Sequence, residues 1–124
     1  MLKPGFQGAL VGLTDHYSAP FDYEDQFFNL YNFSIGSGGQ LAKGGKLDLD
    51  RWFTLQFDWD TVKRDARVSV DGRPVAILPL LRDSHGVCYL RLRSTAAATD
   101  AAGFLVESVE ADVSQSWKKG TALQ

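Results

Sequence analysis

The chain of 124 residues contains one cysteine, Cys88, and no long hydrophobic run. One cysteine excludes an internal disulfide framework and any zinc site built from several cysteines. The longest apolar stretch, residues 75–81, has seven residues and includes Pro79, whereas a membrane-spanning helix needs about 20. We therefore expect neither a disulfide-stapled scaffold nor a membrane partner.

The chain also lacks a large excess of either charge, because 15 acidic and 13 basic residues give a formal net charge of −2. A nucleic-acid-binding domain carries a clustered basic face, so we expect no nucleic-acid partner. Hydrophobic residues make up 44% of the chain and aromatic residues 12%, which excludes a disordered chain. We expect one domain over residues 1–114, and a C-terminal tail over residues 115–124 because that stretch lacks periodicity.

The N-terminal residues lack the pattern of a secretory signal, which is a basic segment followed by a long apolar stretch. Pro4 and Gly5 are instead typical of the approach to a first strand. The compartment therefore stays open. Either the chain stays in the cytoplasm, or it is a piece of a larger exported protein and is extracellular or periplasmic.

Alternation of apolar and polar residues dominates the chain, and no sustained helical period is present. The clearest example is residues 51–60, where Phe53, Leu55 and Phe57 alternate with polar residues. Similar patterns occupy residues 6–14, 27–35, 66–70, 75–81, 87–93 and 104–113. Seven or eight short strands separated by turns predict an all-β fold, an antiparallel two-sheet sandwich, with a barrel as the alternative.

Turn residues punctuate these strands. Asp71 and Gly72 form a strong hairpin signal between two of them. We expect at most one or two helical turns in the chain, within the alanine-rich stretch 94–103, near residues 96–102. In the last strand, residues 104–113, the apolar spacing slips by one residue near Ser108, which suggests a β-bulge.

The strand at residues 87–93 has two different faces. Cys88, Leu90 and Leu92 share one face, so we expect them in the core and expect the thiol to react slowly. The opposite face carries Arg91 and Arg93. These arginines are interpreted as a solvent-facing row that blunts edge pairing. A second interpretation, with Arg82 included, is a grip on an acidic sugar.

The central segments 51–57, 66–75 and 89–93 occur in a recognisable order. A Trp opens the first segment, the second contains the Asp-Gly hairpin, and the third reads Leu-x-Leu. This order resembles the second half of laminin G-like, concanavalin A-like jelly-roll domains. Residues 13–22 and 89–112 also resemble the C-terminal lectin-like domain of bacterial sialidase-like (Asp-box repeat) proteins.

The resemblance implies a jelly-roll fold and a lectin-like module. Complete domains of this kind have more strands before the position of Phe6, so the resemblance implies truncation at the N-terminal edge. The chain would then be a fragment, or its missing edge would be supplied by another subunit. We therefore expect a homodimer through an open sheet edge. The sialidase propeller and its hydrolytic residues have no counterpart here.

The loop over residues 15–25 is the candidate carbohydrate-binding site. It combines aromatic rings, which suit the apolar face of a sugar, with carboxylates, which accept hydrogen bonds from hydroxyls. These residues are Tyr17, Phe21, Tyr23, Asp15 and Asp22. The alternative is that the rings merely cap the end of the sandwich.

The same loop is a candidate calcium site, because Asp22, Glu24 and Asp25 supply the oxygen ligands that calcium prefers. The alternative is a solvated acidic loop, since the EF-hand spacing is absent. No other cofactor is expected.

Catalytic patterns are missing, so we expect no enzyme. Glu107, Glu110 and Asp112 have the wrong order for a laminarinase-type hydrolase and are interpreted as an outward polar face. His85 has no nucleophile motif around it. We expect a non-catalytic module with weak carbohydrate binding. A structural or interaction domain is the alternative, and a small glycoside hydrolase or lyase is the third.

The three tryptophans have different expected roles. Trp59 continues the apolar alternation of its strand and is expected in the core. Trp52 has the opposite parity, and the resemblance implies that it packs on the rim of the sandwich. Trp117 lies beyond the last strand and is the least constrained of the three.

Overall fold

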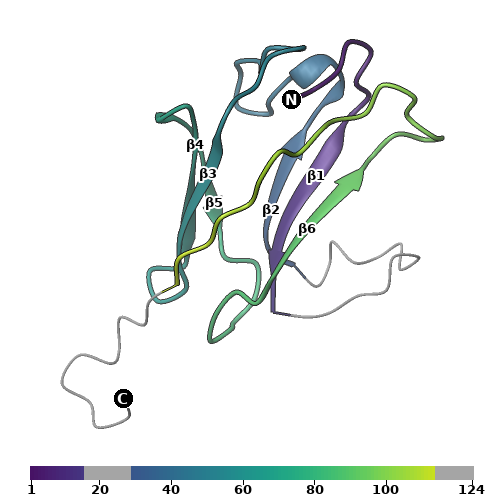
Figure 1. The fold of residues 1–124 in the computed structure, drawn as a ribbon. Coiled ribbons are helices and arrows are strands. Elements are labelled where there is room, and N and C mark those ends of the chain that lie inside the picture. Colours follow the sequence, from purple (N-terminus) through teal and green to yellow (C-terminus); the bar gives the residue numbers. More distant parts are fainter. Residues whose placement is uncertain (16–28, 114–124) are drawn as a thin grey trace, which may run out of the picture.

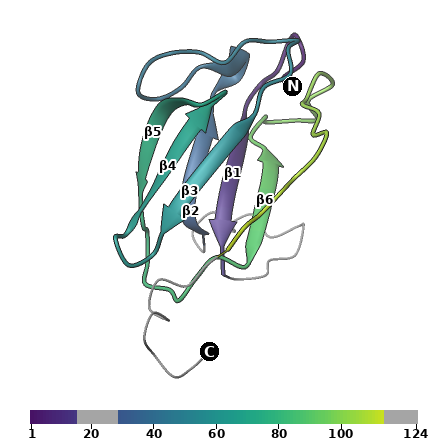
Figure 2. The same cartoon turned by 60° about the vertical axis from the view of Figure 1, so that its left-hand side comes forward.

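The computed structural model describes residues 1–15 and 29–113, which form two antiparallel three-stranded sheets. The strands are β1 (Ala9–Thr14), β2 (Asn29–Ile35), β3 (Leu55–Asp60), β4 (Asp65–Val70), β5 (Arg73–Pro79) and β6 (Tyr89–Ser94). Their orders are β2-β1-β6 and β3-β4-β5. The described residues contain no α-helix and one 3-10 helix, η2 (Ser37–Gly39). The two sheets face each other as the layers of an all-β sandwich (Figures 1 and 2).

The core lies between the two sheets. Val11 of β1 and Phe33 of β2 enter it from one sheet, and Val68 of β4 enters it from the other. The rings of Phe33 and Phe57 meet edge to face, with centroids 5.9 Å apart. Every residue of β1 is buried, and β1 is the central strand of its sheet. The predicted alternation is confirmed in β3 and β4, whereas β1 and most of β2 are buried on both faces.

The hairpin between β4 and β5 turns at Asp71 and Gly72, as predicted. Both residues have positive φ, 49° and 80°, as in the type I′ turns that suit two-residue hairpins. The Asp71 carboxylate also accepts a hydrogen bond from the backbone N–H of Thr54 at 2.9 Å. The turn is therefore tied to the chain that leads into β3.

Residues 94–103, where the sequence predicts at most one or two helical turns, contain none. This stretch instead runs along the N-terminal residues and hydrogen-bonds to them. The N–H of Thr95 donates to the carbonyl of Gly8 at 3.2 Å, and the N–H of Gln7 donates to the Asp100 carboxylate at 2.9 Å. These contacts satisfy backbone groups that a helix would have used internally, so the alanine content does not decide the conformation.

The strand predicted over residues 104–113 is also absent. Phe104 forms an isolated bridge with Leu2, and the N–H of Leu105 donates to the carbonyl of Met1 at 2.8 Å. Beyond residue 105 the segment has no regular secondary structure. It crosses the open side of the sandwich between β3 and β6 (Figures 1 and 2). The apolar alternation is present, but no described strand pairs with it, and a strand requires a neighbour.

The prediction of a buried Cys88 is wrong, because this thiol is exposed. Leu90 and Leu92 are also 41% and 42% exposed. Their predicted side is correct, since Leu92 pairs with Val11 across the sheet, and opposite residues point to the same face. The burial fails because β6 is the outer strand of its sheet, and no described part of the opposite sheet fully covers it.

Candidate functional site

One end of the sandwich gathers polar side chains around the hairpin that joins β3 to β4. The Asp60 carboxylate accepts hydrogen bonds from the N–H groups of Val62 and Lys63, at 2.9 and 3.0 Å. Arg64 adopts the left-handed conformation, with φ 63°. The Tyr31 hydroxyl donates to the Asp60 carbonyl at 3.3 Å. The conformation of the hairpin tip is therefore stabilised by the Asp60 carboxylate, and the Tyr31 hydrogen bond connects the tip to the buried strand β2.

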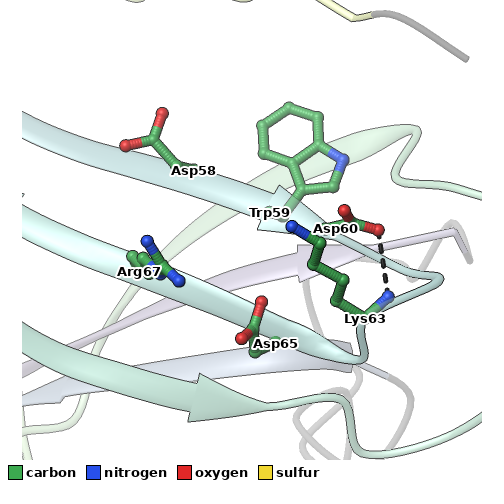
Figure 3. Close-up of a pocket in the computed structure, with 6 residues that line it drawn as sticks. All are labelled: Asp58, Trp59, Asp60, Lys63, Asp65 and Arg67. Carbon is green, nitrogen blue, oxygen red and sulfur yellow. Dashed lines mark hydrogen bonds between the residues drawn. The ribbon is translucent and has the colours of Figure 1, made fainter. Parts of the chain in front are cut away.

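A shallow, open hollow of about 170 Å³ lies on this hairpin. Its lining combines one aromatic ring with three carboxylates and two cations (Figure 3). The lining residues are Asp58, Trp59, Asp60, Lys63, Asp65 and Arg67. The hollow therefore offers an amphipathic surface with both hydrogen-bond donors and acceptors.

Trp59 stands between the core and the hollow. It is partly buried and packs against the cluster that includes Leu13, Tyr31 and Ala66, and it is also one of the residues that line the hollow. The prediction that Trp59 packs in the core is therefore correct, but this residue is only half-buried. The difference arises because β3 is an outer strand of its sheet, so the ring has no further strand beside it in the described structure.

The charges of the hollow follow the strand register. Asp58 lies opposite Arg67, and Asp60 lies opposite Asp65. The first pair is complementary, whereas the second places two carboxylates side by side. The Lys63 side chain folds back over the hairpin toward this pair (Figure 3). The carboxylates of Asp60 and Asp65 would accept hydrogen bonds from a ligand, and the cations of Lys63 and Arg67 lie near them.

A second polar cluster surrounds Asp15, just after the end of β1. Arg82 donates to one oxygen of the Asp15 carboxylate, and the Ser84 hydroxyl donates to the other at 2.5 Å. The N–H of Gly86 donates to the Ser84 oxygen at 3.2 Å. The Ser84 hydrogen bond and the Arg82 charge hold the pKa of Asp15 below its ordinary value, although burial acts in the opposite direction.

The predicted binding loop falls largely outside the described residues. Asp15 is its described member, and its two carboxylate oxygens contact Arg82 and Ser84. Arg82, which the second interpretation of the arginines places in a grip on an acidic sugar, instead binds a carboxylate of this chain. The remaining predicted residues lie in the stretch 16–28: Tyr17, Phe21, Asp22, Tyr23, Glu24 and Asp25.

Metal ligands are not grouped in the part of the chain that the structure describes. No set of three His, Cys, Asp or Glu side chains there is placed to hold an ion. The calcium prediction concerns Asp22, Glu24 and Asp25, which lie outside these residues. It therefore stays a prediction.

The sequence reasoning missed the hollow beside Trp59. The signal was the density of charged residues around the charged turn, with Asp58, Asp65 and Arg67 within one hairpin. Recognising β3 as an outer strand would have kept one side of the Trp59 ring available.

Comparisons with known proteins identified no relative of this chain. No protein-family model, no curated protein and no solved structure matches the chain. Residues 1–15 and 29–113 contain no helix that is long and apolar enough to cross a membrane.

Proposed function

We propose that this chain is a non-catalytic, lectin-like β-sandwich module that binds carbohydrate weakly at the hollow beside Trp59. The observation that supports this proposal is the combination of a half-buried Trp59 with carboxylates and cations on one hairpin. The hairpin is fastened to the core through Tyr31, so little ordering is needed when a ligand binds.

The chemistry of the hollow suits a sugar ring. A pyranose has an apolar face of C–H groups, which stacks on an aromatic ring, and a rim of hydroxyls. Asp58 and Asp65 accept hydrogen bonds from such hydroxyls, while Lys63 and Arg67 donate to them. The volume of about 170 Å³ is below the roughly 300–1,000 Å³ of drug-sized pockets, so we expect recognition of one sugar unit with low affinity.

The predicted loop over residues 15–25 is proposed as a second part of the same surface. Asp15 follows β1 at the end of the sandwich where the β3–β4 hairpin turns (Figure 1). Tyr17, Phe21 and Tyr23 are proposed to supply the aromatic faces of this second part. Bound calcium in this loop is the proposed alternative to direct carboxylate contacts.

A jelly roll of the laminin G-like kind is the proposed finer description of the fold. The two antiparallel sheets and the turn at Asp71 and Gly72 support this description. Trp52, which the resemblance places on the sandwich rim, is 47% exposed. A rim position for this ring is compatible with that exposure.

The proposal of a non-catalytic module is supported by the position of the acidic residues. Retaining glycoside cleavage needs two carboxyl groups held about 5–5.5 Å apart. Glu107, Glu110 and Asp112 lie on an exposed segment without regular secondary structure. These three residues therefore lack the strand that spaces the carboxylates along one face in a laminarinase-type hydrolase.

A glycan array probed with and without calcium tests the function. Asp58→Asn and Arg67→Ala change exposed groups of the hollow, and we expect each to weaken glycan binding at least about tenfold, as loss of a charged hydrogen bond does. Asp48→Asn changes an exposed carboxylate outside the hollow and should leave binding unchanged. The melting temperature should stay constant in all three variants.

Two results would contradict this assignment. If the wild-type protein retains no glycan, the carbohydrate function is wrong. If the hollow variants bind normally and the double change Tyr17→Ala/Tyr23→Ala removes binding without unfolding the protein, the site is the loop alone.

A structural or interaction module is the second candidate function. The observation that favours it is a set of exposed large apolar side chains on the open side of the sandwich. They are Leu90, Leu92, Leu105, Val106, Val109 and Val113. Soluble monomers seldom expose contiguous apolar patches of large area, so this side is suited to packing on another domain or on a second copy.

A further inference from the structure

The hairpin between β4 and β5 places an aspartate directly before a glycine at its tip. Asp71 and Gly72 are both exposed, and Val70 pairs with Arg73 across the turn. The N–H of Gly72 donates no hydrogen bond to a described residue. A Cβ built at Gly72 would meet nothing within 4 Å, so the peptide group that joins Asp71 to Gly72 is accessible.

The side chain of Asp71 can react with the backbone nitrogen of Gly72. This nitrogen attacks Cγ of Asp71, its proton is lost and a Cγ–O bond breaks, so that one water molecule leaves and a five-membered imide forms. Water then opens the imide. Opening at Cγ restores aspartate, whereas opening at the α-carbonyl carbon leaves the chain running through Cβ and Cγ, which is isoaspartate. The reaction needs no oxidant and no cofactor.

The backbone of Asp71 already meets one requirement of the imide. Ring closure brings Cβ and the Gly72 nitrogen to the same side of the Cα–C bond, which sets ψ of Asp71 at about −120°, as at the first central position of a type II′ turn. That position has positive φ, and φ of Asp71 is 49°. Only the peptide plane between the two residues has to rotate, because Gly72 adopts either sign of φ.

The contacts of Asp71 oppose this reaction while the turn is closed. The N–H of Thr54 donates to one carboxylate oxygen at 2.9 Å, and the N–H of Asp71 donates to the Thr54 carbonyl at 2.9 Å. Arg51 donates to the other carboxylate oxygen at 3.2 Å. Ring closure expels one of these two oxygens as water, so it breaks at least one of the carboxylate contacts.

The two carboxylate contacts differ in strength. The side chains of Arg51 and Asp71 are 59% and 40% exposed, and Arg51 also binds Asp48 at 3.0 Å, so this ion pair is a weak restraint. The Thr54 contact is reciprocal and comes from a backbone N–H, which needs no ordering of a second side chain. We therefore expect Thr54 to supply the main restraint and Arg51 a smaller one.

We propose that Asp71 is a site of spontaneous isoaspartate formation, and that its contacts with Thr54 and Arg51 suppress the reaction while the β4–β5 hairpin is closed. Separation of the hairpin from the chain that leads into β3 starts the reaction. Isoaspartate adds one carbon to the backbone of a two-residue turn and moves the carboxylate, so the Thr54 contact does not re-form as before. The modification therefore records, in covalent form, the opening of this end of the sandwich.

The isoaspartate site and the glycan site fail separately. Asp71 follows the end of β4, whereas the hollow beside Trp59 lies at the start of that strand and does not include Asp71. Conversion at Asp71 should therefore leave glycan binding unchanged. Absence of glycan binding leaves the conversion rates interpretable.

Peptide mapping with fragmentation that distinguishes isoaspartate from aspartate measures the conversion over time. We expect the wild-type chain to convert at least about tenfold faster when unfolded in urea than when native, because unfolding removes hydrogen bonds to a charged group. Asp71→Glu, whose longer side chain would have to close a six-membered ring, should give no corresponding product at this position. Equal rates in the native and unfolded chains, or no isoaspartate at Asp71 in the unfolded chain, would overturn the proposal.

Arg51→Ala tests the weaker restraint in the native protein. The rate at Asp71 should rise about two- to fivefold, which corresponds to the strength of an exposed ion pair. Lys3→Ala removes another exposed ion pair, with Asp50 at 3.0 Å, and should leave the rate unchanged. Rates in urea below the unfolding transition check the route, because a rise that comes from global unfolding grows with urea. Such growth, an unchanged rate in Arg51→Ala, or an equal rise in both variants contradicts the proposal.

Discussion

Asp15 shows how the end of the sandwich controls the charge of a single side chain. Its pKa is lowered by the Ser84 hydrogen bond and by Arg82. A carboxyl group whose pKa is lower in the folded state stabilises the fold above its unfolded pKa, about 3.9. This contribution disappears as the pH falls through the folded pKa, because both states then bind the proton.

Ser84→Ala tests this coupling. We expect the free energy of unfolding to fall by about 1–2 kcal/mol at neutral pH, since a hydrogen bond to a charged group is lost. The deficit should shrink below about pH 4, as the wild-type protein loses the same interaction. Urea unfolding at several pH values measures both effects, and exposed Ser34→Ala is the control. A deficit that stays constant down to pH 2 would show that Ser84 acts without the Asp15 charge.

Among the elements of secondary structure, the short 3-10 helix η2 depends on glycine. Gly39 has φ +91°, and a Cβ built there would lie 2.3 Å from the backbone carbonyl oxygen of Leu47. The same region is held by a hydrogen bond from the Leu47 N–H to the Gly39 carbonyl at 2.9 Å. The close approach of these two backbones therefore requires a residue without a side chain.

Gly39→Ala should lower the free energy of unfolding by about 3 kcal/mol, because backbone strain and a steric clash add together. Gly38→Ala is the matched control. Gly38 also has positive φ, +70°, but has nothing within 4 Å of its Cβ position, so it should lose only about 1–2 kcal/mol. Equal losses in the two variants would mean that the loop relaxes and that the contact with Leu47 is not restrictive.

At the scale of the whole molecule, the described residues form two sheets with no α-helix. We expect far-ultraviolet circular dichroism to show a β spectrum with a helical content well below the roughly one-third of typical globular domains. A helical content above about a fifth would be incompatible with the two-sheet arrangement.

The sequence alone predicted the local backbone conformation well where it depends on residues that are close together in the chain. Val11 and Phe33 alternate with residues of the opposite face, and Asp71 with Gly72 permits the positive φ of a tight turn. Both signals depend on residues close together in the chain. The side to which Leu92 points was also correct, since strand parity follows from position.

Burial and the candidate site were decided by tertiary structure. Cys88 and Leu92 have the composition of core residues but are exposed, because β6 is an outer strand and the opposite sheet does not fully cover it. Trp59 lines a hollow for the same reason, since β3 is also an outer strand. The segment beginning at Phe104 alternates as a strand does, yet no described strand lies beside it for pairing. Alternation determines which side of a strand a residue occupies, whereas a neighbour distant in sequence determines whether that side is covered.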